Sequence, residues 1–157
     1  MIQKKIRTAF ELTSEIVSRR WPDNPSILDV GCRGCELDSH LTGVRYSGAD
    51  QFQNAAGTVE FVCNLNLDFP MADRSFDVVV GLGVLEHMDD LQGGLDEMLR
   101  VARLGAVVLL PNMAHVFCRV RFCLFGDMGD KYDLKFGQGP DRHRWVTTLD
   151  QSDAFMR

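Results

Sequence analysis

Short apolar runs recur along the chain, and each of them is bounded by residues that favour turns. The five runs are SILDV at 26–30, VRYSGAD at 44–50, TVEFVC at 58–63, FDVVVGL at 76–82 and GAVVLLP at 105–111. Short runs of Val, Leu and Phe between Gly, Pro, Asn and Asp are typical of strands. The pattern therefore predicts five strands.

Two other stretches repeat apolar residues at helical spacing. The first is a leading helix within residues 1–25, which ends at Trp21-Pro22 and whose stripe consists of Ile6, Phe10, Thr13 and Val17. The second follows the fourth run, begins at a cap from Asp89 or Asp90, and repeats Leu91, Leu95, Leu99 and Ala102. Strands that alternate with helices predict an α/β fold with a doubly wound, mostly parallel sheet and helices on both faces.

One connection is too short for this pattern. Residues 51–57, QFQNAAG, join the second and third runs, whereas a parallel crossover normally needs about a dozen residues and a helix. We expect a loop or a single turn there. With 157 residues the chain has the size of one domain, so we assign residues 1–157 to a single unit.

Charge and composition narrow the class of partner. The formal net charge is -5, whereas nucleic-acid binders usually carry a basic surface, so we expect no nucleic acid and favour small molecules or proteins. The amino-terminal segment at 1–20 has no apolar run long enough for a signal peptide or a membrane span, and we expect no membrane span. The five cysteines are an odd number without an export signal, which favours reduced thiols and the cytoplasm.

The bend after the first run is the strongest candidate for a ligand site. In parallel sheets the first strand-to-helix turn cradles the ligand, and Asp50 ends the second run where a carboxylate binds ribose hydroxyls. A plain tight turn is the alternative. The G-x-G-x-x-G pattern of dinucleotide sites is absent, as is any Tyr-x-x-x-Lys, which disfavours a nicotinamide-dependent oxidoreductase. A ligand without phosphate, whose ammonium group lies near Asp29, fits better, and S-adenosylmethionine answers that description.

The order of the motifs resembles the class I S-adenosylmethionine-dependent methyltransferases, in particular the small methyltransferase-domain group that includes relatives of the methionine-biosynthesis protein MetW. The segments that carry the resemblance are ILDVGCRGCEL, GAD, FDVVVGLGVLEH, LLPN and DRHRWVTTLDQSDAF. The family motif D-x-G-x-G-x-G would place glycines at 31, 33 and 35. This chain has Gly31, Arg33 and Cys35, with Gly34 between the last two.

The resemblance implies S-adenosylmethionine as cofactor and assigns ten residues to it. Around the methionine part it places Asp29, Gly31, Cys32 and Gly34. At the ribose and adenine it places Asp50, Gln51 and Asn64, and the pocket walls would come from Leu65, Gly81 and Leu82. No catalytic residue is assigned, because methyl transfer from a sulfonium can proceed largely by proximity and alignment.

Two further features have open interpretations. Cys32 and Cys35 would suit a redox pair, or half of a zinc site with Cys118 and Cys123, but the latter two are too widely spaced, so we expect no metal site. His87 in LEHM would line the pocket or simply pack.

The last part of the chain bears on the acceptor and on partners. The resemblance makes residues 114–140 a lid-like insertion, whose apolar character suggests a small or lipid-like methyl acceptor. We expect the final antiparallel strand pair of the family to be lacking, in which case the fifth strand would be an edge that pairs with a second copy or a partner subunit. The lost glycines leave a second function open: a catalytically degenerate, methyltransferase-like binding or regulatory subunit.

Overall fold

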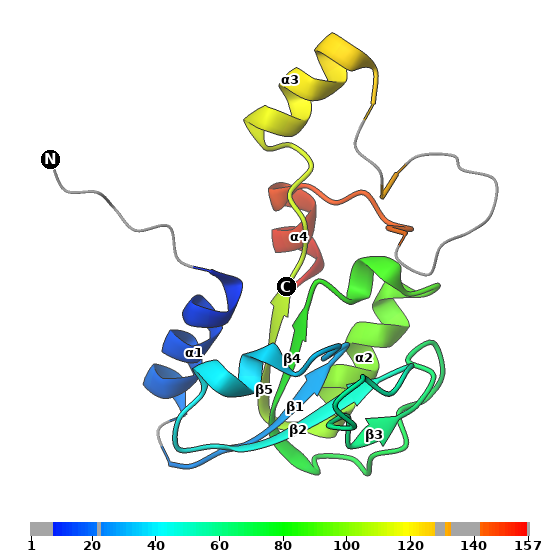
Figure 1. The fold of residues 1–157 in the computed structure, drawn as a ribbon. Helices are drawn as coiled ribbons and strands as arrows, with labels where there is room; N and C mark the ends of the chain where they lie inside the picture. Colours follow the sequence, from blue (N-terminus) through cyan, green and yellow to red (C-terminus); the bar gives the residue numbers. More distant parts are fainter. Residues whose placement is uncertain (1–7, 22, 128–130, 133–141, 157) are drawn as a thin grey trace, which may run out of the picture.

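The computed structural model describes residues 8–21, 23–127, 131–132 and 142–156. Its sheet contains β1 (Ser26–Val30), β2 (Arg45–Asp50), β3 (Phe61–Val62), β4 (Phe76–Leu82) and β5 (Ala102–Leu109). All neighbouring strands pair in parallel, in the order β3-β2-β1-β4-β5 (Figure 1). The predicted doubly wound parallel sheet is therefore confirmed, because the strand order reverses between β1 and β4.

Helices cover both faces of this sheet, as predicted. On one face lie α1 (Ala9–Arg20) and the 3₁₀ helix η1 (Glu36–His40), where the fully buried side chains are Val17, Ile27, Leu37, Val78 and Val80. On the other face lies α2 (Leu91–Val101), whose Leu95 and Met98 pack against strand residues that include Leu28, Val30 and Val79. Successive strand residues thus point to opposite faces.

The helix boundaries follow from local chemistry. Thr8 caps α1 with a reciprocal capping box, since its hydroxyl accepts from the Glu11 amide and the Glu11 carboxylate accepts from the Thr8 amide. Asp90 caps α2 by accepting from the Gly93 amide, as one of the two predicted capping residues. The predicted stripe residue Ile6 lies outside the described residues.

Strand β3 is much shorter than the run at 58–63 that predicted it. The side chains of Gln53 and Asn54 accept hydrogen bonds from the amides of Val59 and Thr58, which removes both amides from the strand ladder. The preceding segment contains turns and no helix, as its length predicted. Strand β5 begins at Ala102, directly after α2, and so starts earlier than the run at 105–111 indicated.

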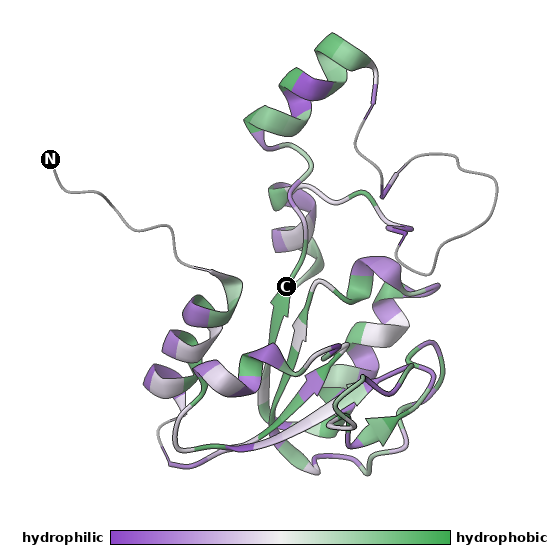
Figure 2. Ribbon diagram, viewed as in Figure 1, coloured by the Kyte–Doolittle hydropathy of each residue, from purple (hydrophilic) through white to green (hydrophobic). Residues whose placement is uncertain are grey.

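Two helices follow the sheet in the described part of the chain. α4 (Leu149–Phe155) brings Phe155 against the α2 side of the core. α3 (Val116–Phe125) has no buried residue and stands away from the sheet at the top of Figure 1. Figure 2 shows that this projecting helix is largely hydrophobic. Among the described residues, no helix has both the length and the apolar character to cross a membrane.

Candidate functional site

A cavity of about 410 Å³ opens at the carboxyl ends of β1 and β4, where the strand order reverses. Ligands bind at this point in open parallel sheets. The cavity is lined by Phe10, Asp29, Gly31, Cys32, Arg33, Glu36, Leu82, Gly83, Glu86, Lys131 and His143.

The loop after β1 is held by its own backbone. The amides of Gly31 and Cys32 both donate to the Ala49 carbonyl, at 2.8 and 3.2 Å. Gly31 has a φ of +74°, and a Cβ added there would lie 2.6 Å from Cγ2 of Val84. Both the backbone conformation and the lack of space require glycine at this position.

Arg33 and Cys35 occupy the positions where the family pattern places glycine. Their φ angles are 47° and 57°, in the left-handed region that side chains disfavour. Asp50, at the end of β2, stabilises this bend because its carboxylate accepts from the Arg33 amide at 2.9 Å and from the Phe52 amide at 3.2 Å. The backbone at positions 33 and 35 therefore adopts the conformation typical of glycine, although neither residue is glycine.

This conformation also explains why only a short 3₁₀ helix follows β1. Cys35 precedes η1 in the left-handed conformation and makes no side-chain cap, so no α-helix begins there. Its sulfur lies 3.6 Å from that of Cys32, and all five cysteines are free.

Asp29 is an acid buried at the cavity floor. Only 5% of it is exposed, and its Oδ2 accepts a 2.7 Å hydrogen bond from the Tyr46 hydroxyl. The pKa of Asp29 is raised to about 7, mainly by burial and to a smaller extent by the nearby charges of Glu36 and Asp50, while the Tyr46 hydrogen bond opposes the rise. The side chain is thus poised to give up a proton when a cation approaches.

Glu86 is a second buried acid on the wall of the cavity. Burial raises its pKa above the usual range, while the charges of His87, Lys131 and Arg33 oppose the rise. Its Oε1 lies 3.8 Å from Nε2 of His143. Its Oε2 is buried and accepts no hydrogen bond from the described residues. With Asp29 and Glu36, three carboxylates line the cavity.

The structure brings together four of the ten residues predicted for the cofactor: Asp29, Gly31, Cys32 and Leu82 line the cavity. Gly34 lies in the same loop, and Asp50 bonds that loop from β2. The other four lie outside the lining. Gly81 faces Met98 of α2, Leu65 is in the core on the α2 side, and Gln51 and Asn64 are exposed.

Sequence reasoning missed the other residues of the lining. Glu86 precedes His87 in LEHM, directly after the fourth strand. An acidic residue at that strand end could have been named as a candidate for the cavity wall. His143 and Lys131 lie far along the chain from the strands, and no spacing rule connects them to β1 or β4.

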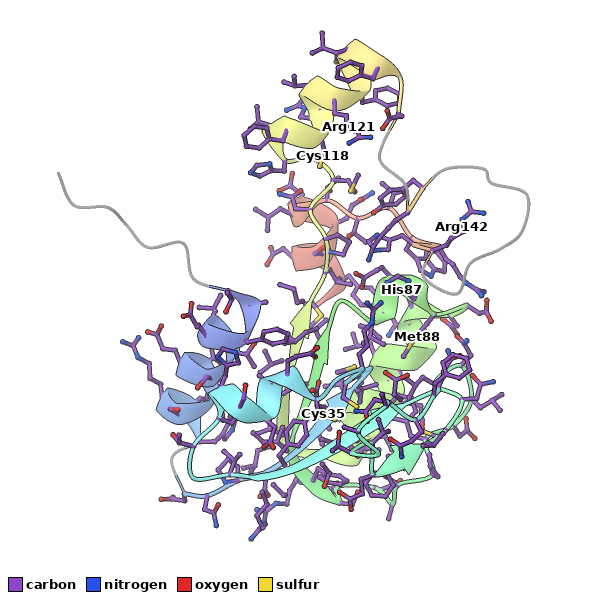
Figure 3. The ribbon with its side chains drawn as sticks, viewed as in Figure 1. Cys35, His87, Met88, Cys118, Arg121 and Arg142 are labelled. Carbon is purple, nitrogen blue, oxygen red and sulfur yellow. The ribbon has the colours of Figure 1, made fainter. Side chains whose placement is uncertain are left out.

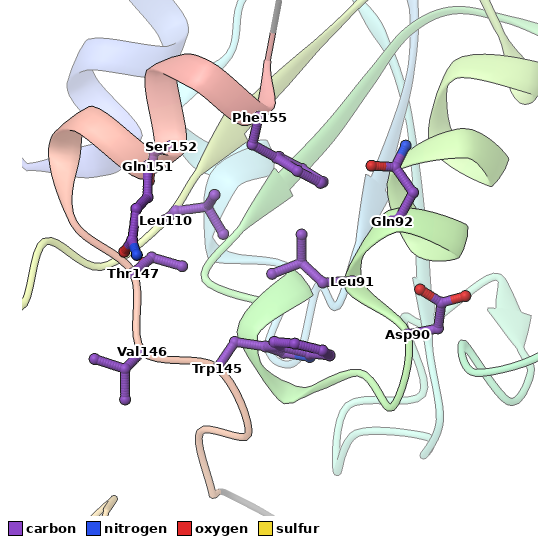
Figure 4. Close-up of a pocket in the computed structure, with 10 residues that line it drawn as sticks. All are labelled: Asp90, Leu91, Gln92, Leu110, Trp145, Val146, Thr147, Gln151, Ser152 and Phe155. Carbon is purple, nitrogen blue, oxygen red and sulfur yellow. The ribbon is translucent and has the colours of Figure 1, made fainter.

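A second cavity, of about 300 Å³, lies between the start of α2 and α4 and shares no lining residue with the first (Figure 4). Its walls are mainly apolar and include Leu91, Leu110, Trp145 and Phe155. The indole of Trp145 donates to the Met88 carbonyl at 2.9 Å, which anchors the segment before α4.

The fold and the acid-lined cavity define a Rossmann-like α/β domain with a cavity at the switch point of its sheet. Residues 28–110 match the family described as "Methyltransferase domain". The chain belongs to this family.

Curated relatives and solved structures agree with this assignment. The chain is 29% identical over 87 residues to ajmaline N-methyltransferase of Rauvolfia serpentina, covering 55% of this chain and 30% of that one. It is 32% identical over 103 residues to O-methyltransferase rstn1 of Aspergillus nomiae, covering 55% and 46%. The chain thus spans less than half the length of either relative.

A solved S-adenosylmethionine-dependent methyltransferase of Thermotoga maritima, a possible histamine N-methyltransferase, superposes with a TM-score of 0.62 at 16% identity, covering 94% of this chain and 67% of that one. The 1,6-didemethyltoxoflavin-N1-methyltransferase of Burkholderia thailandensis, solved with S-adenosylhomocysteine, gives a TM-score of 0.50 at 20% identity, covering 60% and 48%. These structures support the class I methyltransferase fold.

Proposed function

We propose that this domain binds S-adenosylmethionine in the cavity at the ends of β1 and β4 and transfers its methyl group to a small-molecule acceptor. The observation that carries the proposal is the acid-lined cavity at the switch point, next to the glycine bend of a methyltransferase-family chain. When bound, the cofactor supplies an electrophilic methyl group on a positively charged sulfur.

The chemistry of the cavity fits such a ligand. S-adenosylmethionine carries an ammonium and a sulfonium charge, and three carboxylates line the cavity. A buried carboxylate is costly unless a positive charge or hydrogen-bond donors compensate it. Asp29 is only 5% exposed and burial disfavours its ionised form, so a cationic ligand beside it would stabilise the carboxylate.

Each part of the cofactor is assigned to residues at or after the end of a particular strand. Asp29, Gly31, Cys32 and Gly34 would surround the methionine part. Asp50 would hold the ribose, since each of its oxygens accepts one backbone hydrogen bond and keeps a second acceptor site for a hydroxyl. The adenine would lie near Gln51 and Asn64, with walls from Leu65, Gly81 and Leu82.

The acceptor is a small or lipid-like molecule in this proposal. The names of the curated relatives describe methyl transfer to nitrogen and oxygen, one of them on ajmaline. The protein's main contribution would be to hold acceptor and methyl donor in line and to exclude water. No general base is assigned.

The insertion at 114–140 would act as the lid over the acceptor. Residues 128–130 and 133–140 lie outside the described part, but α3 is described and carries exposed Phe117 and Phe122, at 77% and 54%. Replacing both by alanine should weaken acceptor binding and leave cofactor binding unchanged. Unchanged acceptor binding would remove the lid role.

A catalytically degenerate binding or regulatory domain is the second candidate. It is favoured by Arg33 and Cys35, which put side chains where the family has bare backbone. Either function suits the cytoplasm, where free thiols persist.

Calorimetry with S-adenosylhomocysteine tests the proposal. The wild-type chain should show saturable heat, and Gly31→Val should abolish it, because the added side chain meets Val84. Asp29→Asn should weaken binding at least tenfold, whereas Asp38→Asn, on the exposed part of η1, serves as the matched control. No heat from a folded wild-type chain would favour the degenerate domain.

A further inference from the structure

Glu86, His87 and His143 form a cluster that neither the fold nor the proposed cofactor site requires. Each offers one ligand atom, and the three atoms lie within 4.8 Å of one another. Glu86 and His87 belong to the 3₁₀ helix η2 (Leu85–His87) after β4, and His143 comes from the segment before α4. Figure 3 shows His87 below the segment that carries Arg142.

Hydrogen bonds orient both imidazole rings. Nδ1 of His87 lies 2.9 Å from the Arg142 carbonyl. A carbonyl only accepts, so this Nδ1 carries a proton, and in the neutral ring Nε2 holds the lone pair. Nδ1 of His143 lies 2.7 Å from the Tyr132 hydroxyl, which leaves its Nε2 to face Glu86 at 3.8 Å. The carbonyl thus fixes the tautomer of His87, and the Tyr132 hydroxyl fixes the orientation of the His143 ring, as outer hydrogen bonds do for metal-binding histidines.

The carboxylate completes the set. Glu86 is only 3% exposed, and its Oε2 accepts no hydrogen bond from the described residues. The charges of His87, Lys131 and Arg33 act on Glu86, but Oε2 itself accepts no hydrogen bond, and a divalent cation would coordinate this oxygen directly.

We propose that Glu86, His87 and His143 bind one divalent transition-metal ion through a carboxylate oxygen and two imidazole nitrogens. Ligand atoms about 2.1 Å from one ion lie roughly 3 to 3.5 Å apart, so the side chains must close by roughly 1 Å from their present positions. The rotations required are small. The two-histidine, one-carboxylate set suits Zn²⁺, Fe²⁺ or Co²⁺ better than Mg²⁺ or Ca²⁺, which prefer oxygen ligands.

Three protein ligands leave coordination positions open. Glu86 and His143 both line the cavity, so these positions border it. Two of the three metal ligands line the cavity proposed for the cofactor, but none of the three is among the ten residues assigned to it, so the metal site can be tested without methyl transfer.

Metal binding can be measured directly on chelator-treated, desalted protein. Titration with Zn²⁺ should give one tight site per chain and raise the melting temperature of the wild type. His143→Ala and Glu86→Gln should each weaken binding at least tenfold and remove the thermal shift. His115→Ala, which removes an exposed histidine at the start of α3, should bind as the wild type does.

Two further measurements keep the assignment specific. Tyr132→Phe removes only the outer hydrogen bond to His143 and should weaken Zn²⁺ about tenfold, as the loss of such partners typically does. The absorption spectrum with Co²⁺ should lack thiolate-to-metal bands. Those bands would place the ion on cysteine thiolates and overturn the assignment. The absence of saturable Zn²⁺ binding, or unchanged affinity in folded His143→Ala, would overturn it too.

The outcome is separable from that of the cofactor proposal. S-adenosylhomocysteine binding is measured on metal-free protein, and Zn²⁺ binding is measured without cofactor. If the protein fails to bind one of the two ligands, binding of the other can still be measured.

Discussion

Tyr46 on β2 donates a 2.7 Å hydrogen bond to Oδ2 of Asp29 on β1, beneath the candidate cofactor cavity. Burial raises the pKa of Asp29 and the hydroxyl partly offsets the rise, with a net pKa of about 7. Asp29 is therefore partly protonated at neutral pH, so a change in its protonation can be measured.

Cofactor binding should release a proton from Asp29 at pH 7. A cationic ammonium group beside the carboxylate lowers its pKa, so the bound state holds fewer protons than the free state. Calorimetry with S-adenosylhomocysteine in buffers of different ionisation enthalpy should show this release in the wild type and lose it in Asp29→Asn. An identical release in that variant would assign the proton to another group.

The same pKa predicts a pH dependence of stability. The folded chain binds the Asp29 proton more tightly than the unfolded chain, so the contribution is full below the unfolded value of 3.8 and is lost as pH rises through about 7. The difference amounts to on the order of 4 kcal/mol. Urea unfolding at about pH 4.5 and about pH 7.5, roughly the ends of that window, should show a steeper decline for the wild type than for Asp29→Asn.

Gly31→Ala should destabilise the chain more than Gly43→Ala does. Both glycines have positive φ, so alanine costs about 1–2 kcal/mol of strain at either position. Only at Gly31 does the new Cβ also meet Val84, at 2.6 Å, whereas nothing lies within 4 Å at Gly43. Equal losses in the free energy of unfolding would show that Val84 moves aside.

Arg33→Gly and Cys35→Gly should maintain or raise stability. Glycine relieves the strain of a residue with a left-handed backbone conformation, but it also increases the conformational entropy of the unfolded chain. We therefore expect each substitution to stabilise the fold by between 0 and about 1 kcal/mol. Thermal unfolding measures this directly. A loss above about 1 kcal/mol would mean that the side-chain contacts, such as the Cys32–Cys35 pair, outweigh the strain.

The parts of this structure that sequence could predict are those fixed by local periodicity. The five apolar runs predicted the sheet, and the turn after Val30 predicted the edge at which the cavity lies. The predicted helical stripe was only half right: Leu91 and Leu95 are buried on α2, but Leu99 is 50% exposed and Ala102 begins β5, because α2 ends at Val101. Asp29 lies near the end of β1, and Gly31 forms the left-handed turn that follows it, so the position of both residues at the cavity follows from local sequence.

The rest depends on contacts between distant segments. His143 reaches Glu86 only because the segment before α4 returns over β4, and no pattern within either segment encodes that approach. The missing α-helix after β1 likewise reflects the left-handed Cys35, a backbone state that its residue type argues against.

Asp77→Asn should weaken the amino end of the sheet. Asp77 is 7% exposed and accepts from the amide and hydroxyl of Ser26 at 2.9 and 3.0 Å, and from Arg103, so it joins β4 to β1 and β5. Removing the charge should cost about 2 kcal/mol at pH 7. These partners, first of all the Ser26 amide, lower its pKa, so the stabilisation is present above 3.8 and is lost as pH falls through the folded value. A constant difference between Asp77→Asn and wild type from pH 7 down to about pH 2 would contradict this.

The edge of β5 should support association of the 157-residue chain with itself. Within the described residues β5 pairs only with β4, and Leu104 on it is 53% exposed. An apolar edge with unpaired backbone groups favours pairing with a second chain, and a lysine there opposes it. Light scattering at high concentration should show dimers that Leu104→Lys dissociates. Leu99→Lys is the matched control, because Leu99 is 50% exposed on α2. A strictly monomeric wild type would exclude self-pairing at this edge.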